Sequence, residues 1–474
     1  MPDASLAVPT RSAAPNHVLG IVCVGIVLAN LDLFIVNVAL PDMARSFRDA
    51  TLEDLSWILN GYAIAYAALL VFFGRLAERH HRNHGFLLGV ALFTAASAAC
   101  AAAWSVDALV AFRLVQAAGA ALMTPASLGL LLASFPPDRR GGAVRTWTAI
   151  GGLGAALGPL VGGVLVTFDW RWIFAVNVPI GFAALLIGWR LLPDVPGHDV
   201  PRPSIRAATL VTGGIGLLTY AIIKVNDWGW LSLKVGSCLL LSSVALSLFV
   251  RHCLRSSNPF VDPALFRIRP FAGSVLVSAP FSAAFAGMLL SVALYQQDVW
   301  GFSGLQAGLA IAPGPLMVPL TSILVAGWLI RRFGALTVVS TGLLCFAAGL
   351  AWWAARMGPT PDVPVVVIGM MLTGLGVGLT LPTVMGVGLG SLPPSSFATG
   401  SGVANMVRQA CMAVGVAVLV AVLGSPPDAA ARTHAYQSGW WILTLLTLVS
   451  LVPAWLLLRD ASRPARAGTG DVSR

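Results

Sequence analysis

Charged residues are scarce in this chain. Only 10% of its 474 residues are Asp, Glu, Lys or Arg, whereas 57% are hydrophobic. A soluble fold has no place for so much apolar surface, which excludes an ordinary soluble domain. A helix needs about 20 apolar residues to cross a bilayer, and we count fourteen such segments with few long polar stretches between them. The sequence therefore predicts an all-α polytopic membrane protein without a separate soluble domain.

Lysine is almost absent, and cysteine occurs without paired spacing. The two lysines, Lys224 and Lys234, are each followed by Val and neither follows a Gly, so the chain has no Walker A loop and is not predicted to be an ATP-driven pump. The six cysteines lie in or beside apolar segments, which predicts neither disulfides nor a zinc site. His80, His81 and His84 are interpreted as part of a solvated loop rather than as metal ligands. We find no catalytic constellation, so the sequence predicts neither an enzyme nor a metal or organic cofactor.

The positive charges predict the topology. Most of the 29 Lys and Arg residues fall in the loops of one side when the N-terminus is placed in the cytosol, as the positive-inside rule requires. The first apolar segment begins at Val18 and is too long for a signal peptide, so we expect it to remain as the first helix. Residues 1–17 and 460–474 are then cytosolic tails. The net charge of +10 favours contact with anionic membrane lipids rather than with nucleic acid.

One carboxylate lies well inside a membrane segment. Asp32 is in the first predicted helix, where an ionisable side chain is costly unless it faces a partner or a cavity. Burial favours the neutral form of a carboxylate, so Asp32 is a candidate proton carrier, with a structural ion pair as the alternative. Arg113 in the fourth predicted helix lies at a similar depth, at about 1.5 Å of rise per residue. A movement that separated the two would favour proton uptake by Asp32; a purely structural Arg113 is the alternative.

Further polar residues inside predicted helices are candidates for the wall of a substrate cavity. Gln116 lies three residues after Arg113 and shares its helix face. Arg408, in the thirteenth predicted helix, needs a partner or water, and snorkelling to lipid headgroups is the alternative. For the asparagines, packing or a helix kink is the alternative. The candidate cavity residues are Asn37, Gln116, Asn177, Asn405, Arg408 and Gln409.

A run of glycines crosses the membrane in the fifth predicted helix, over residues 142–167. Interior Gly costs about 1 kcal/mol against Ala in a soluble helix, and Pro about 3. In lipid, small residues three or four apart let another helix approach backbone to backbone, and a Pro kinks the axis. An ordinary small-residue packing face is the alternative to a functional motif. The members of this motif are Gly151, Gly154, Gly158, Pro159, Gly162 and Gly163.

A short charged segment joins the second and third predicted helices. Residues 74–85 read GRLAERHHRNHG, and charges of both signs beside two membrane ends suit a latch that opens and closes as two halves of a protein move. A shift that places Gly74 on Gly327 aligns this segment with GWLIRRFG in the second half of the chain. The candidate cytoplasmic gate residues are Gly74, Glu78, Arg79, Arg82, Arg331 and Arg332.

The same shift places the first, fourth and fifth predicted helices on later apolar segments, which predicts two related bundles. We expect one six-helix bundle over residues 18–192 and a second over residues 252–459. The linker between them, residues 193–251, contains two more apolar segments and is predicted to add two inserted helices. Two bundles with a cavity between them suit alternating access.

Two of these segments resemble motifs of the major facilitator superfamily. Residues 74–83 resemble its motif A, GxLxDrxGRr, with Glu78 in place of the usual Asp and His81 in place of Gly. Residues 109–121 resemble its motif B, LxxxRxxQGxgaA, with Ala117 in place of Gly.

Two further segments narrow the resemblance. Residues 151–163 resemble the GxxxGPxxGG antiporter motif of major facilitator exporters, and residues 170–181, WRWIFAVNVPIG, resemble a segment of the fourteen-helix drug:proton antiporters. The resemblance covers nearly the whole chain. It implies the major facilitator fold with two inserted helices in a bacterial cytoplasmic membrane, and multidrug, antiseptic or antibiotic substrates.

The function expected from residues and resemblance together is proton-coupled secondary export. A proton enters down its gradient, neutralises Asp32, and drives a monomeric transporter to release a small lipophilic compound outward. Import or symport of a metabolite and a non-transporting membrane sensor or scaffold are the alternatives. The tenth predicted helix lacks an acidic residue, so we expect poor handling of dications.

Overall fold

The computed structural model describes residues 14–47, 50–197, 204–257, 259–392, 397–424 and 426–458. Within these segments all regular structure is helical, and fourteen helices or unbroken helix series are long and apolar enough to cross a membrane.

The first part of the chain forms six spans. Their helices are α1 (Pro15–Ser46), α2 (Leu52–Arg79), α3 (Arg82–Ala101), α4 (Val106–Ser134), α5 (Pro137–Val166), and the consecutive α6 (Trp172–Ala175) and α7 (Asn177–Leu191). Two spans follow, α8 (Ile205–Ile223) and α10 (Leu233–Arg255), with the short α9 (Val225–Trp228) between them.

The last part of the chain forms six more spans after a short helix, η1 (Pro263–Arg267). These are α11 (Arg269–Asp298), the series α12 (Gly304–Ile311), α13 (Pro313–Leu320), η2 (Thr321–Ala326) and α14 (Gly327–Phe333), then α15 (Ala335–Arg356), α16 (Val363–Gly390), α17 (Phe397–Leu423), and the consecutive α18 (Ala429–Val449) and α19 (Leu451–Leu457).

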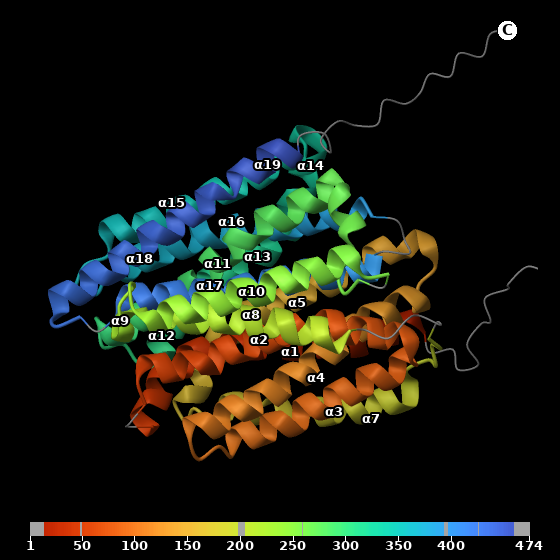
Figure 1. The fold of residues 1–474 in the computed structure, drawn as a ribbon, viewed down its shortest axis with the longest axis horizontal. Helices are drawn as coiled ribbons and strands as arrows, with labels where there is room; N and C mark the ends of the chain where they lie inside the picture. Colours follow the sequence, from red (N-terminus) through yellow and green to blue (C-terminus); the bar gives the residue numbers. More distant parts are fainter. Residues whose placement is uncertain are drawn as a thin grey trace, which may run out of the picture.

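The helices pack as two bundles with a pair between them. In Figure 1 the first bundle, red to yellow, lies mainly below, the second, green to blue, mainly above, and α8 and α10 cross the middle of the view. The first bundle is held by contacts of α1 with α5 and of α4 with α2 and α3, and the second by contacts of α11 with α17 and of α15 with α16 and α18. The inserted helix α8 packs against α10 and also touches α2 and α17, so it covers the seam between the bundles.

The two bundles contact each other most extensively at two places. Helix α2 packs along α17, and α5 packs against α12 and α13. Buried small side chains form the first contact, including Ala67 and Ala68 on α2 with Val403 and Ala404 on α17. Small residues allow close helix packing where lipid offers no hydrophobic driving force for association.

The glycine face of α5 explains how that helix packs inside its own bundle. A Cβ placed at Gly154 would lie 3.0 Å from the Cα of Val27, and one at Gly158 would lie 2.9 Å from the Cβ of Phe34. At Gly162 a Cβ would lie 3.0 Å from the carbonyl oxygen of Ile35. These contacts all lie on α1, so the spacing of the glycines sets the distance between α1 and α5.

The expected charged loop after α2 is mostly helix, which corrects the prediction for residues 74–85. Helix α2 continues to Arg79 and α3 begins at Arg82, so only His80 and His81 link them. The apolar pattern ends at the membrane boundary, whereas backbone hydrogen bonding continues into water. A basic residue in the last turn also stabilises a helix through its dipole.

The tenth span is irregular, which the sequence pattern did not predict. Pro313 begins α13 and Pro319 lies inside it, followed by a π-helical turn over Thr321–Ala326. Each Pro removes a backbone donor, and π turns are frequent at functional sites. The span therefore crosses as short helical pieces in series rather than as one regular helix.

Candidate functional site

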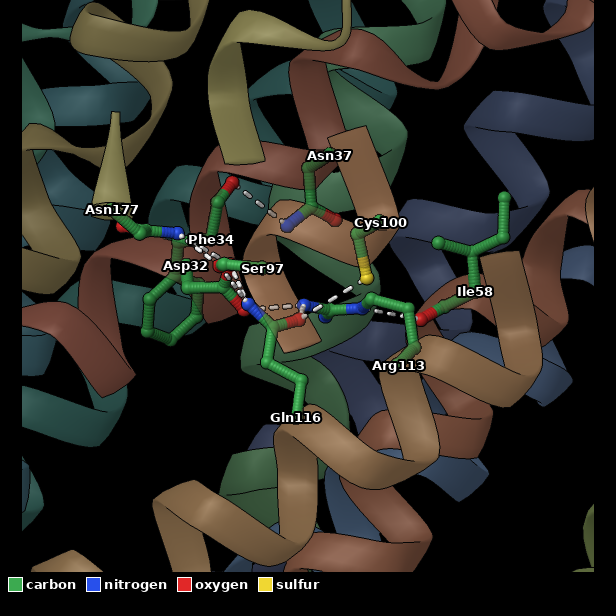
Figure 2. Close-up of polar contacts among 9 residues, drawn as sticks. All are labelled: Asp32, Phe34, Asn37, Ile58, Ser97, Cys100, Arg113, Gln116 and Asn177. Carbon is green, nitrogen blue, oxygen red and sulfur yellow. Dashed lines mark hydrogen bonds and ion pairs between the residues drawn. The ribbon is translucent and has the colours of Figure 1, made fainter. Parts of the chain in front are cut away.

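A buried polar cluster lies in the middle of the first bundle (Figure 2). It joins Asp32 from α1, Ser97 from α3, Arg113 and Gln116 from α4, and Asn177 from α7. Each of these five side chains is fully buried among apolar neighbours. Four of the five are sequence candidates, and four helices are needed to bring them together.

The carboxylate of Asp32 accepts several charged or amide donors. Arg113 Nη1 pairs with Oδ2, while Gln116 Nε2 donates to Oδ1 over 2.8 Å and Asn177 Nδ2 donates to the same atom over 3.0 Å. An ionised carboxylate is an acceptor at both oxygens, so this set of donors suits the charged form. Protonation of Asp32 would weaken these interactions, because a neutral carboxyl group is a poorer acceptor than a carboxylate.

The guanidinium of Arg113 is held from several sides. Its Nε donates to the carbonyl of Ile58 over 3.2 Å and its Nη1 also donates to Gln116 Oε1 over 2.7 Å. The ring centroid of Tyr62 lies 4.0 Å from its Cζ, a cation–π contact. Within the described residues its Nη2 has no partner, so the cluster keeps a free donor beside Asp32.

Ser97 is the member of the cluster that sequence reasoning missed. Its Oγ accepts from Gln116 Nε2 over 2.6 Å and from Asn177 Nδ2 over 3.1 Å, so it orients both amides toward Asp32. A lone Ser in an Ala-rich helix resembles ordinary small-residue packing, and nothing in its local sequence distinguishes it.

Ser97→Ala should lower the melting temperature of the purified protein. The change removes the hydroxyl oxygen that accepts from the buried amides of Gln116 and Asn177. A buried polar group that loses its partner costs about 1–3 kcal/mol of stability. Ser243→Ala is the matched control, because Ser243 is exposed and bonds only to its own helix. Equal melting temperatures for the two variants would contradict the role of Ser97 in the cluster.

A small cavity lies between the bundles, next to the cluster. Its volume is about 30 Å³, room for water but not for a drug-sized molecule. Asn37 and Asn60 are its polar lining residues; the side chain of Asn37 donates to the carbonyl of Phe34 over 3.1 Å. Both side-chain polar atoms of the buried Asn60 lack a partner within the described residues. The lining residues are Leu33, Phe34, Asn37, Leu59, Asn60, Ala63, Ala286, Leu289, Met412, Ala413 and Val416.

The candidates on α17 lie apart from the Asp32 cluster, in the second bundle. Arg408 Nη2 donates to Asn405 Oδ1 over 3.0 Å, and Asn405 also donates to the carbonyl of Ser401. Gln409 is fully buried, and neither of its side-chain polar atoms has a partner in the described part of the chain.

Comparisons with known proteins decide the family. The family model described as Major Facilitator Superfamily matches residues 22–416 and 276–472. The chain belongs to the major facilitator superfamily. It is 33% identical over 405 residues to the tetracenomycin C resistance and export protein of Streptomyces glaucescens, covering 85% of this chain and 74% of that protein. It is 34% identical over 413 residues to the multidrug resistance protein Stp of Mycobacterium tuberculosis, covering 86% and 76%.

The fold agrees with this membership. The crystal structure of the peptide transporter POT in complex with sulfate has a TM-score of 0.66, with 19% identity over 93% of this chain and 96% of that one. The predicted family, the all-α fold with fourteen membrane helices and the prediction of a transporter rather than an enzyme are confirmed. This major facilitator protein is therefore a multi-pass membrane protein that moves small substrates.

The α5 motif of this major facilitator protein faces both bundles. Gly151, Gly154, Gly158 and Gly162 face α1, whereas Pro159 and Gly163 face the second bundle. A Cβ at Gly163 would lie 2.7 Å from the carbonyl oxygen of Gly304, and one at Gly308 would lie 2.8 Å from the carbonyl oxygen of Pro159. The motif thus forms a backbone contact between bundles near the start of α12.

The candidate gate residues occupy two places. Arg82 Nη1 donates to the carbonyl of Gly129 over 3.2 Å, and Gly74 lies against Pro125, so both contact α4. Arg79 ends α2, and the side chain of Glu78 lies outside the described residues. Arg331 and Arg332 are exposed on α14, which packs against η2 and α15 in the second bundle.

Proposed function

We propose that this protein is a proton-coupled antiporter that exports lipophilic drugs or antibiotics by alternating access. Relatives with 33% and 34% identity are named for tetracenomycin C resistance and export and for multidrug resistance. The observation that carries proton coupling is the buried Asp32–Arg113 ion pair, whose carboxylate is reached by donors from α4 and α7.

The ion pair supplies a physical switch. In the structure, the donors around Asp32 stabilise its ionised form, whereas separation from Arg113 would leave a buried carboxylate that favours protonation. A movement of α1 against α4 inside the first bundle would therefore couple proton binding to the position of α1, which packs against α11 of the second bundle. Each proton supplies about 1.4 kcal/mol per pH unit and about 2.3 kcal/mol per 100 mV.

Alternating access is supported by contacts at both ends of the seam. At one end α5 touches α12 through Gly163 and Gly304, and toward the other end α2 touches α17 near Val71 and Gly402. The cavity between them holds about 30 Å³, so a substrate enters only when one of these contacts opens.

The direction of transport is tested in energised bacterial cells that express the chain. Export predicts lower accumulation of a fluorescent lipophilic dye than in cells without it, and a protonophore should remove the difference. Higher accumulation would favour an importer or symporter. No difference with any member of a dye panel would favour a non-transporting sensor and contradict the proposal.

The proposed setting is the bacterial cytoplasmic membrane, with a monomeric transporter and both termini in the cytosol. The positive charges of the loops support this orientation and contact with anionic lipids. Exposed apolar side chains such as Leu240, Leu241 and Leu248 on α10 suit contact with lipid. No organic or metal cofactor is proposed, because the proton gradient supplies the energy.

Dications should be poor substrates of this exporter. The tenth span, Gly304–Phe333, contains no Asp or Glu, so it offers no carboxylate to balance a second positive charge. Transport of a divalent quaternary ammonium dye should stay near the rate of protein-free liposomes. Robust proton-driven transport of that dye would contradict this prediction.

A further inference from the structure

Arg408 is a cation deep inside a membrane helix, and it has no carboxylate partner in the part of the chain that the structure describes. It lies eleven residues after the start of α17 at Phe397, about 16 Å along the helix at about 1.5 Å per residue. Its Nη2 donates to the neutral Asn405, and its buried Nε has no partner within the described residues. An unpaired charge in a low-dielectric interior is costly, so such a residue calls for an occupant that balances it.

Arg408 lies on α17, the helix of the second bundle that packs along α2 of the first bundle. Tyr66 lies on α2, which packs along α17 and meets it at Val71 and Gly402, and the Tyr66 hydroxyl hydrogen-bonds with Thr124 over 3.0 Å. The neighbouring Gln409 is fully buried with both polar atoms unpartnered in the described chain. Headgroup snorkelling does not account for these observations, because Nη2 of Arg408 bonds to Asn405 on its own helix and Nε is buried.

This polar layer lies next to the cavity. Met412 and Ala413 line the cavity, and Arg408 and Gln409 precede them by four residues, one helical turn away on the same faces. On α2, Ala63 lines the cavity and Tyr66 follows three residues later. The antiparallel contact of α2 and α17 thus places Tyr66, Arg408 and Gln409 in one layer at the end of the cavity nearer Gly74.

Among the described residues, no carboxylate pairs with the positive charge of this layer. The charged side chains that are fully buried in the described residues are Asp32 and Arg113, which neutralise each other inside the first bundle. An oxyanion would pair with Arg408 by charge-assisted hydrogen bonds, and the Gln409 amide would supply a further donor.

We propose that Arg408 and Gln409 form an anion subsite beside Tyr66, and that the preferred substrates are lipophilic compounds carrying one oxyanion group such as a carboxylate or sulfonate. This inference rests on the proposed export function, whose substrate class it names. Arg408 binds the oxyanion, and the apolar body of the substrate occupies the adjacent cavity as the bundles separate.

The test measures equilibrium binding to the purified full chain in phosphatidylcholine nanodiscs. Fluorescence energy transfer from tryptophan to pyrene reports the binding. The probes share one ring system: pyrenesulfonate, pyrenemethanol and trimethyl(pyrenylmethyl)ammonium. Pyrenesulfonate should bind tightest. Arg408→Gln should weaken its binding at least about tenfold and Arg408→Lys about threefold or less, while pyrenemethanol binding changes less than about twofold.

Arg190→Gln is the matched control, since Arg190 is exposed at the end of α7. This variant should bind all three probes as the natural chain does. Without probe, Arg408→Gln should melt no lower than the natural chain, because the change removes a half-buried charge that pairs with no carboxylate in the described part of the chain. A lower melting temperature with equal loss of all three probes would show a structural role and overturn the subsite.

A lipid phosphate is the other source of an oxyanion. If phosphatidylglycerol in the nanodiscs displaces pyrenesulfonate from the natural chain, the site holds a lipid headgroup and the substrate inference fails. Equal affinity for the sulfonate and the alcohol would also overturn it. Binding needs no proton gradient, so loss of proton-driven export with binding intact would refute the proposed function alone.

Discussion

Asp32→Asn should reduce proton-driven transport by at least about 100-fold, a loss of about 2.7 kcal/mol or more in the coupled step. Asn keeps the shape of the side chain but cannot take up and release a proton. It also leaves Arg113 as an unpaired buried cation, for which removal of one partner costs about 3–5 kcal/mol of stability. The measurement is transport by purified protein in liposomes under an imposed pH gradient, with the melting temperature measured in parallel.

The double variant Asp32→Asn/Arg113→Gln separates coupling from stability. It removes both charges of the ion pair, so the melting temperature should recover toward that of the natural chain while proton-driven transport stays absent. Asp107→Asn is the control for loss of a carboxylate, because Asp107 is exposed in the first turn of α4. Recovery of proton-driven transport in the double variant would show that Asp32 and Arg113 are a structural pair.

Gly163→Ala should slow transport by about tenfold, equal to about 1.4 kcal/mol, by preventing α5 and α12 from closing. A Cβ at this position would lie 2.7 Å from the carbonyl oxygen of Gly304, and backbone atoms cannot move aside as a flexible side chain can. Pulsed electron paramagnetic resonance with spin labels at the exposed positions Phe168 and Leu309 should report a longer distance in Gly163→Ala than in the natural chain.

Gly152→Ala is the matched control on the same helix. No atom lies within 4 Å of a Cβ built at Gly152, so the same substitution there should change neither the label distance nor the rate. If both variants lower transport equally, the effect is a general one of Ala in α5. If neither variant changes the label distance, the contact between Gly163 and Gly304 does not hold the bundles together.

The sequence predicts two kinds of feature well: charged residues that are rare inside membrane helices, and glycines at regular spacing along a helix. A single carboxylate within a span identified Asp32, and helix depth matched it with Arg113, the residue it pairs with in the structure. The glycine spacing predicted a close helix contact, and the structure shows α1 as the partner. Charges and missing side chains have large energetic consequences in lipid, so rarity and spacing indicate where such residues make contacts; proton coupling by Asp32 and Arg113 stays a prediction.

Small polar residues were harder to interpret. Ser97 and Asn60 look like packing residues in their own helices, and only the arrangement of helices shows that Ser97 orients two amides and that Asn60 lines a cavity. The end of α2 was misplaced for a different reason. Hydropathy reports where the bilayer ends, whereas the backbone of α2 continues as helix to Arg79.

Proton movement in liposomes that contain only this protein is the most direct test of proton-coupled export through Asp32. A trapped pH-sensitive dye reports protons that cross when pyrenesulfonate is added under an imposed pH gradient. We expect substrate-dependent proton flux down the gradient, with pyrenesulfonate moving in the opposite direction. We expect no proton flux with Asp32→Asn. Transport of pyrenesulfonate with no proton flux, or equal flux in the natural chain and Asp32→Asn, would contradict proton-coupled export through Asp32.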